Sequence, residues 1–199
     1  YGNAAGGYAS TVPGGDWSEA LGDWSLAAGR QAKALHAGAF VWADTSFGDF
    51  TSTDFNQFLI RAAGGTKIYS NSPASVGVQL AAGGNSWSAI SDRNVKENVT
   101  PVDSRDVLDR LAAIPIGEWN LISQDPSIRH IGPMAQDFHA AFRVGEMETH
   151  ISSSDADGVA LAAIQGLYEI VQEKDCEVEE LRSEIEDLKE LVKALAAQN

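Results

Sequence analysis

The spacing of apolar positions changes along this chain, and each spacing predicts a different element. Over residues 15–38, small apolar and polar residues alternate in seven-residue units that begin with glycine: Gly15–Leu21, Gly22–Ala28 and Gly29–Leu35. A glycine in every heptad costs about 1 kcal/mol relative to alanine in a helix, which disfavours a helical repeat. Glycine corners joined by short strands are typical of a stacked β-solenoid. We therefore predict a Gly-rich, head-like β-roll over residues 1–54.

Residues 55–90 predict the short strands of a shaft end. Alternating runs occupy Phe55–Arg61, Thr66–Tyr69 and Val76–Leu80, and glycine- or proline-containing turns lie between them. An array this short buries little core by itself, and a single coil of the solenoid cannot bury its own apolar face either. We therefore expect oligomerisation to complete the hydrophobic core of both segments.

From residue 164 onward the apolar residues recur at alternating spacings of three and four, which predicts a coiled coil over 164–199. The a and d positions that form the predicted trimer core are Ile164, Leu167, Val171, Val178, Leu181, Ile185, Leu188 and Val192. Lys174 is the one polar d residue. Glu177 with Arg182, and Glu184 with Lys189, form g-to-e′ pairs, which join neighbouring chains only when these run parallel.

Two signals disagree on the number of chains. β-Branched residues at a with leucine at d favour a dimer, whereas Ile170 and Leu191 at g and Tyr168 at e widen the apolar seam. The wider seam offers more surface than a dimer buries, so we predict a parallel homotrimer.

Residues 91–163 predict a small α+β domain. Its expected elements are a helix capped by Asp103 or Ser104 and ending at Ala113, a strand over Ile116–Leu121 and a helix over Pro133–Phe142. The predicted fold class is therefore mixed: a trimeric β-solenoid or β-prism shaft, a small α+β domain and a long parallel coiled-coil helix.

Composition supports this division. Residues 1–90 hold 14 of the 19 glycines, and residues 91–199 hold 22 of the 28 acidic residues. The net charge of -14 argues against nucleic acid as a partner, because binding phosphates requires a cationic face.

No run reaches the roughly 18 apolar residues that span a bilayer, so we expect no membrane insertion. The chain begins at Tyr1, inside a repeat, and we expect it to be a fragment of a longer protein.

The glycine-rich units share the pattern Ser-x-Ala-x-Gly, which ends at Gly29 in one unit. Over residues 2–43 this pattern resembles the head repeats of trimeric autotransporter adhesins. The stretch contains Trp17, Trp24, Phe40 and Trp42. Aromatic faces stack on sugars, which makes a host glycan or receptor a candidate partner. The alternative is that these rings cap the solenoid interior or the seam between chains, as half-buried aromatics more often do.

Residues 91–199 contain a second, more specific series of motifs. In order these are Ser91–Val99 with Pro101, Leu108–Leu111, Ile131–Asp137 and the closing coiled coil. The series resembles the C-terminal intramolecular chaperone of bacteriophage tail spikes and endosialidases, the S74 peptidase family. Pro133 departs from that family, which more often has an aliphatic residue there. The resemblance implies a domain that trimerises, folds the upstream fibre of the same chain, and then cuts itself off with a Ser-Lys dyad. Carried over by motif, the dyad is Ser91 and Lys96.

The residues can be tested against that chemistry directly. A serine hydroxyl needs a base, and a lysine acts as one only when burial or a nearby cation lowers its usual pKa of about 10.4. Side chains five residues apart lie about 140° apart on a helix and on opposite faces of a strand. Ser91 and Lys96 therefore meet only across a turn or between chains. The cut is expected at Ile90-Ser91 or Ser91-Asp92, and Asp92 and Glu97 either orient Lys96 or are solvated carboxylates.

The leading hypothesis is an intramolecular chaperone that trimerises and folds a phage tail fibre or spike, then releases itself next to Ser91. The mature fibre would belong to the virion tail and serve host attachment, after assembly in the host cytoplasm. The rival is a structural or receptor-binding trimeric tip that is not cleaved. We expect no cofactor and no metal, because His130, His139 and His150 have no compact ligand spacing.

Overall fold

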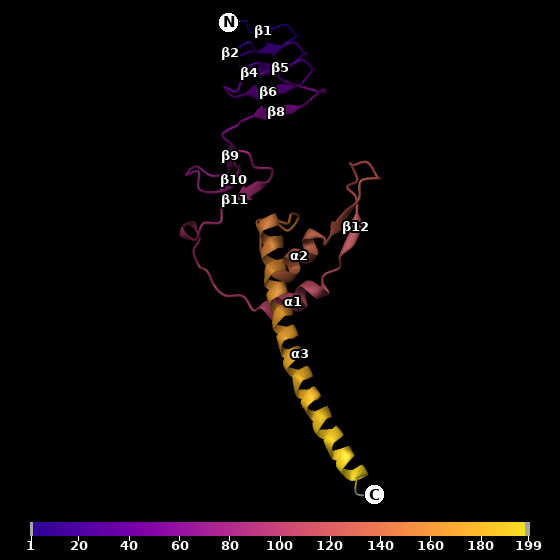
Figure 1. The fold of residues 1–199 in the computed structure, drawn as a ribbon. Helices are drawn as coiled ribbons and strands as arrows, with labels where there is room; N and C mark the ends of the chain where they lie inside the picture. The colour runs from indigo at the N-terminus through magenta and orange to yellow at the C-terminus, as the bar shows by residue number, and fades with distance from the viewer. Residues whose placement is uncertain (1, 198–199) are drawn as a thin grey trace. The chain divides into compact units, whose positions relative to one another are not determined.

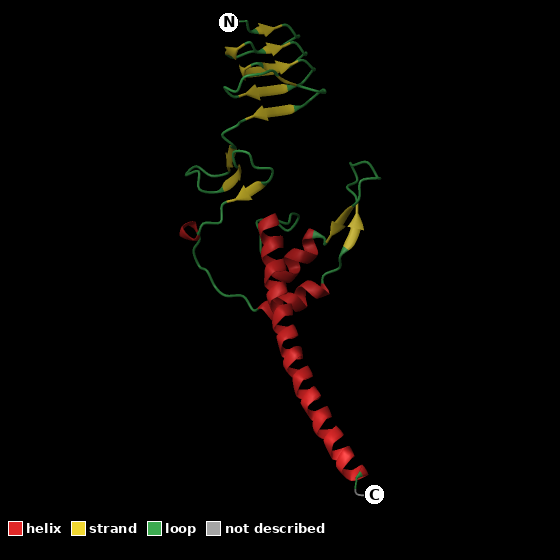
Figure 2. Ribbon diagram, viewed as in Figure 1, coloured by secondary structure: helices red, strands yellow, loops and turns green. Residues whose placement is uncertain are grey.

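A computed structural model describes residues 2–197 and divides the chain into two compact units, Tyr1–Glu97 and Asn98–Asn199. Residue 1 and residues 198–199, the outer ends of the predicted segments 1–54 and 164–199, lie outside the described residues. The first unit contains strands and one short 3-10 helix, and the second is mainly helical (Figures 1 and 2).

The first eight strands form a β-solenoid of two parallel sheets, with the orders β1-β3-β5-β7 and β2-β4-β6-β8 (Figure 1). Their bounds are β1 Ala4–Ala5, β2 Gly15–Asp16, β3 Glu19–Ala20, β4 Leu26–Arg30, β5 Ala32–Ala34, β6 Phe40–Ala43, β7 Phe50–Thr51 and β8 Phe58–Arg61. Gly15 pairs with Gly29, fourteen positions later, so one coil comprises two of the seven-residue units. Each coil contributes one strand to each sheet, as β2 and β3 do. The predicted β-solenoid is confirmed.

Glycine at the first position of a unit allows the coils to stack. At Gly29 the backbone has φ +98°, and an added Cβ would lie 1.8 Å from the carbonyl oxygen of Ala43 in the next coil. Gly15 has the same relationship to the carbonyl oxygen of Gly29. A side chain at either corner would therefore collide with the backbone of the coil that follows.

The interior of the solenoid is narrow and lined by small side chains. The buried cluster consists of Ala20, Ala27, Ala32, Ala34, Ala39, Val41 and Ala43. Trp17 and Trp24 occupy left-handed corners and remain 55% and 66% exposed, so they do not cap this interior. Phe40 and Trp42 lie on β6, where they flank the buried Val41. Since neighbouring strand residues face opposite sides, these two rings point outward.

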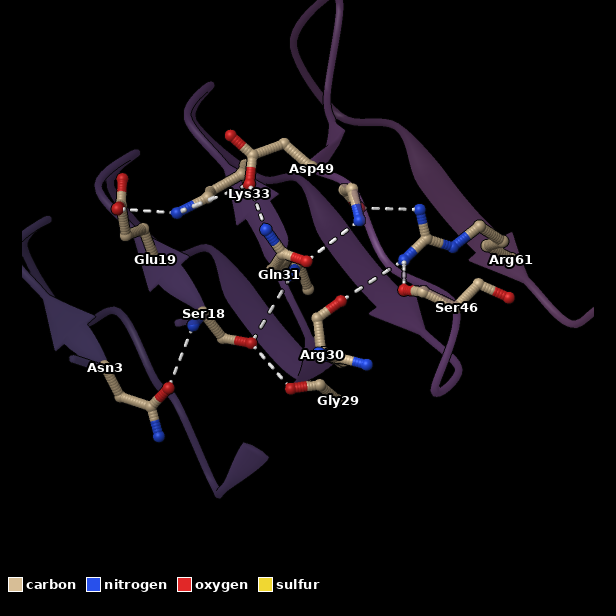
Figure 3. Close-up of polar contacts among 12 residues, drawn as sticks. Asn3, Ser18, Glu19, Gly29, Arg30, Gln31, Lys33, Ser46, Asp49 and Arg61 are labelled. Carbon is tan, nitrogen blue, oxygen red and sulfur yellow. Dashed lines mark hydrogen bonds and ion pairs between the residues drawn. The ribbon is translucent and has the colours of Figure 1, made fainter. Parts of the chain in front are cut away.

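The coil changes length near its C-terminal end. Phe40 pairs with Phe58, eighteen positions later, because residues 44–49 form an inserted loop. The guanidinium of Arg61 holds this loop by donating hydrogen bonds to the carbonyl oxygens of Gly48 at 2.8 Å and Ser46 at 2.9 Å (Figure 3). As a result β8, which we assigned to the segment 55–90, pairs with β6 as the last strand of the solenoid.

Polar residues join successive coils on the other sheet. Lys33, which is buried, lies with its Nζ 2.6 Å from the carboxylate of Glu19 one coil earlier (Figure 3). The carboxylate of Asp49 accepts a hydrogen bond from the side-chain amide of Gln31. These contacts fix the register of the coils, because each joins residues of neighbouring coils.

An antiparallel sheet of three strands follows the solenoid, in the order β11-β10-β9. Its members are β9 Thr66–Tyr69, β10 Gly77–Leu80 and β11 Trp87–Ala89. The first two strands were predicted, and β11 was not. The sheet ends one residue before Ile90.

Residues 98–197 of the second unit form three helices and a two-stranded sheet. Its elements are α1 Ser104–Ala113, β12 Gly117–Trp119, β13 His130–Gly132, α2 Ala135–Phe142 and α3 Ser153–Ala196. Asp103 caps α1, accepting hydrogen bonds from the amides of Arg105 and Asp106, as the sequence predicted. Helix α2 begins after Met134, so Pro133 lies before the helix rather than in its first turn. No helix among residues 2–197 combines the length and the apolar character needed to cross a membrane.

Helix α3 confirms the predicted long C-terminal helix but begins at Ser153, eleven residues before the predicted start. Its additional turns and the turns that follow pack against α1. At the crossing, an added Cβ on Gly166 would lie 2.4 Å from the carbonyl oxygen of Ser104. The two backbones therefore touch, and the site excludes any side chain.

Candidate functional site

Ser91 and Lys96 lie in contact within a single chain. The Nζ of Lys96 donates a hydrogen bond of 2.7 Å to the Oγ of Ser91. The sequence allowed the two side chains to meet across a turn or between chains, and the structure brings them together across a turn. This separation is within the range over which a base takes a proton from a hydroxyl.

The turn between them is the 3-10 helix η1, Arg93–Val95. Asp92 precedes it with φ −69° and ψ 133°, and Lys96 follows it with φ −109° and ψ 143°. Both flanking residues are thus extended, and a single helical turn lies between them. This turn allows two side chains five residues apart to meet.

The whole segment from Ile90 to Glu97 is exposed in the single chain. The Oγ of Ser91 lies within hydrogen-bond reach of the Lys96 amine, and water reaches both members of the pair. A lysine becomes a general base after losing its proton, and burial favours that neutral form. The contact is therefore preformed, whereas the water-excluding surroundings of a Ser-Lys site are not provided by one chain.

The two acidic residues beside the pair behave differently. The carboxylate of Asp92 accepts hydrogen bonds from the backbone and side-chain amides of Asn94, at 2.9 and 3.0 Å. Lys96 is not among its partners within residues 2–197. For Glu97, the described part of the chain provides no side-chain hydrogen bond or ion pair. Neither carboxylate therefore orients Lys96 by direct contact.

A second candidate surface is the apolar stripe of α3. Every residue of the predicted trimer core is exposed in the single chain, from Ile164 at one end to Val192 at the other. The predicted interchain partners Arg182 and Lys189 instead form local pairs with Glu179 and Glu186, three residues earlier. These pairs are solvent-exposed, and such pairs contribute little to stability. The stripe is therefore a large apolar surface without a partner among residues 2–197.

Helix α1 lies on the opposite side of α3 from this stripe. Arg105 forms ion pairs with Glu169 and Glu173. In the heptad numbering that places Ile164 at a, Gly166 and Glu173 occupy c, and Glu169 occupies f. The c and f positions face away from the a/d seam. Helix α1 thus covers part of the outer face of α3 and leaves the seam accessible.

The charges at this crossing support one another. The hydrogen bond from Arg105 lowers the pKa of the Glu173 carboxyl below its usual value, and the same bond raises the pKa of Arg105. Both groups are exposed, so the ion pair positions α1 more than it stabilises the fold.

The histidines have separate partners. His130 contacts the side-chain amide oxygen of Gln124, His139 lies near Glu148, and His150 contacts Thr149. Within residues 2–197, no group of three or more His, Cys, Asp and Glu side chains has the arrangement of a metal site.

Comparison with known families gives a match over part of the chain. Residues 91–144 match the model of the family Peptidase_S74, which is described as the chaperone of endosialidase. The matched segment begins at Ser91 and extends through α2. This match supports an intramolecular chaperone role for this part of the chain and indicates a peptidase of the self-cleaving serine type. No curated protein and no solved structure matches the chain.

Proposed function

We propose that residues 91–199 trimerise, guide the folding of the β-solenoid upstream in the same chain, and then cut the chain next to Ser91. Ser91 is the nucleophile and Lys96 is its general base. The observation that carries this proposal is the 2.7 Å contact between Lys96 Nζ and Ser91 Oγ, at the point where the family match begins. No cofactor takes part.

The reaction follows from the positions of the atoms. Neutral Lys96 removes the proton from Ser91 Oγ, which attacks the carbonyl carbon of Ile90. The peptide bond to the Ser91 nitrogen breaks, that nitrogen takes up a proton, and an ester joins Ile90 to Ser91 Oγ. Water then hydrolyses the ester, leaving a carboxylate on Ile90 and a free amine on Ser91.

Ring size distinguishes the two candidate bonds when a chain cuts itself. Attack on the Ile90 carbonyl passes through a ring of five atoms, whereas attack by Ser91 on its own carbonyl requires a strained ring of four. In-chain cleavage therefore favours Ile90-Ser91. Cleavage at Ser91-Asp92 would require the hydroxyl of another chain.

Assembly would control the reaction through burial. The contact between Ser91 and Lys96 is already present in one chain, so trimerisation is not needed to bring the two side chains together. Both are exposed there, and a neutral lysine is favoured by removal from water. We expect neighbouring chains to cover the turn, so that cleavage begins only after the trimer has formed.

The trimer itself is supported by the position of the α3 stripe. Its apolar a and d residues are exposed along the described helix, and α1 packs on the other side of α3. Three parallel chains would bury this stripe in a common seam. The same arrangement would place three solenoids side by side with their coils in register.

The biological setting extends this proposal. The released solenoid would be part of a tail fibre or spike in the virion, assembled in the host cytoplasm. Trp17 and Trp24 are exposed at solenoid corners, which favours contact with a host glycan or receptor over a role in the solenoid core. The same two rings suit the second candidate function, a trimeric receptor-binding tip that stays uncleaved.

The experiment is a cleavage time course of the full chain by gel electrophoresis. Wild type is compared with Ser91→Ala and Lys96→Ala. Ser88→Ala and Lys67→Ala serve as matched controls, because they remove the same groups from nearby strands. We expect two fragments from the wild type and both controls, and an intact chain from both dyad variants. Fragments from Ser91→Ala would exclude Ser91 as the nucleophile.

A further inference from the structure

The turn that joins Ser91 to Lys96 depends on one residue more than on any other. Asp92 Oδ1 accepts hydrogen bonds from both nitrogens of Asn94, and the Asp92 carbonyl oxygen accepts one from the amide of Val95 at 3.2 Å. The amide of Lys96 then donates to the carbonyl oxygen of Arg93, also at 3.2 Å. Three of these four bonds end on Asp92.

The effect of this turn on the reacting pair is large. An extended chain separates residues five positions apart by about 17 Å, which is far beyond the reach of a proton transfer. In the folded turn the two functional atoms are 2.7 Å apart. Any group that stabilises the turn therefore raises the fraction of time in which Lys96 contacts Ser91.

The charge of Asp92 would act against catalysis. A negative group near a lysine favours the protonated form, and that form cannot accept the serine proton. The carboxylate of Asp92 is directed to Asn94 rather than to Lys96. What the reaction requires at position 92 is consequently an acceptor oxygen in the capping position, and not a charge.

We propose that Asp92 is the positioning residue of the self-cleavage reaction and that it acts by accepting hydrogen bonds from Asn94. Glu97 has no comparable role. The proposal rests on the proposed function of Ser91 and Lys96. It assigns different roles to two carboxylates that each follow one member of the dyad directly in the sequence.

The test compares cleavage rates of the full chain with single changes at these positions. We expect Asp92→Ala to slow cleavage about tenfold, which is the typical effect of losing a capping acceptor. Asp92→Asn and Asp92→Ser retain an acceptor, so both should cleave within about threefold of the wild-type rate. Glu97→Gln is the matched control and should leave the rate unchanged.

A second readout separates positioning from electrostatics. If Asp92 acts by geometry, Asp92→Ala lowers the rate at every pH, and Asp92→Asn does not raise the pH of half-maximal rate, because removing the charge can only favour neutral Lys96. An Asp92→Asn rate as low as that of Asp92→Ala would overturn the proposal, since the charge would then be required. A wild-type rate for Asp92→Ala would overturn it as well.

Asn94→Ala provides an independent check, because it removes only the side-chain partner of Asp92 and should slow cleavage by a smaller factor. Ser91→Ala is run in parallel. Continued cleavage in Ser91→Ala would refute the proposed function itself. An intact Ser91→Ala chain together with full activity of Asp92→Ala would refute only the role of Asp92.

Discussion

Gly166 of α3 lies directly against the carbonyl oxygen of Ser104, the first residue of α1. An added Cβ would be 2.4 Å from that oxygen and 2.8 Å from the carbonyl carbon. Backbone atoms cannot move aside as the end of a side chain can. The absence of a side chain at position 166 is therefore what allows α1 to rest on the outer face of α3, with the seam left free.

This contact predicts opposite effects for two glycine substitutions in one helix. Gly166→Ala should destabilise the second unit by about 1–3 kcal/mol, because the helices must separate. Gly158→Ala is the control: its Cβ would meet no atom within 4 Å, and alanine in a helix is favoured over glycine by about 1 kcal/mol. Chemical unfolding in a Ser91→Ala background measures both. Equal stability of the two variants would contradict the role assigned to Gly166.

The solenoid corners allow a similar comparison. Gly29 and Gly48 both have positive φ, but only at Gly29 does an added Cβ approach another coil, 1.8 Å from the Ala43 oxygen. We expect Gly29→Ala to lower the free energy of unfolding by about 1–3 kcal/mol more than Gly48→Ala does. Thermal unfolding followed by circular dichroism gives the difference. If both variants lose the same free energy of unfolding, the positive φ alone accounts for the requirement for glycine, and the close approach of the next coil does not contribute.

The apolar stripe of α3 gives a prediction on assembly. Leu181→Asp or Ile185→Asp would place three charges in one layer of the seam, at a cost of several kcal/mol per ion. Sedimentation should show loss of the trimer, and cleavage should fall with it. Ser183→Asp adds the same charge at an f position on the outer face and should retain both. A monomeric Leu181→Asp chain that cleaves normally would refute control of cleavage by assembly.

The solenoid could be predicted because its signal is local. Glycine at the first position of each unit is required by contact with the next coil, so the stacking leaves a periodic trace in the sequence. The trace ends where residues 44–49 enlarge the coil, and β8 was consequently separated from the solenoid to which it belongs. The strand β11 was missed because Trp87–Ala89 is too short to give an alternating pattern.

The candidate site shows a different limit. The motif identified Ser91 and Lys96, and their spacing restricted them to a turn or to two chains. The turn forms because Asp92 caps it by accepting hydrogen bonds from Asn94. An aspartate two residues before an asparagine is visible in the sequence, but we interpreted Asp92 as a residue that orients Lys96 or as a solvated carboxylate. The start of α3 at Ser153 was missed for another reason: the buried residues of this stretch are Ala162 and Ala163, which lie outside the a/d positions, so no heptad pattern marks it.

The chaperone role predicts that residues 1–90 need the rest of the chain to fold but not to remain folded. Coils that depend on contacts between chains should nucleate slowly and pair in the wrong register. The α3 helices, by contrast, would hold three chains together and raise their local concentration. Residues 1–90 expressed alone should aggregate or remain monomeric, whereas the same segment released by cleavage should persist as a soluble trimer. Light scattering of the two preparations provides the comparison. Trimers formed equally well by the isolated segment would reduce residues 91–199 to a trimerisation cap.

The central claim is that this chain cuts itself at Ser91, and the intact mass of the freshly purified wild-type chain tests it most directly. We predict two species whose masses sum to that of the 21.1 kDa chain plus one water, with the C-terminal fragment beginning at Ser91. A fragment beginning at Asp92 would instead indicate attack by the hydroxyl of another chain. A single species of 21.1 kDa, unchanged after prolonged incubation of the assembled trimer, would contradict the account.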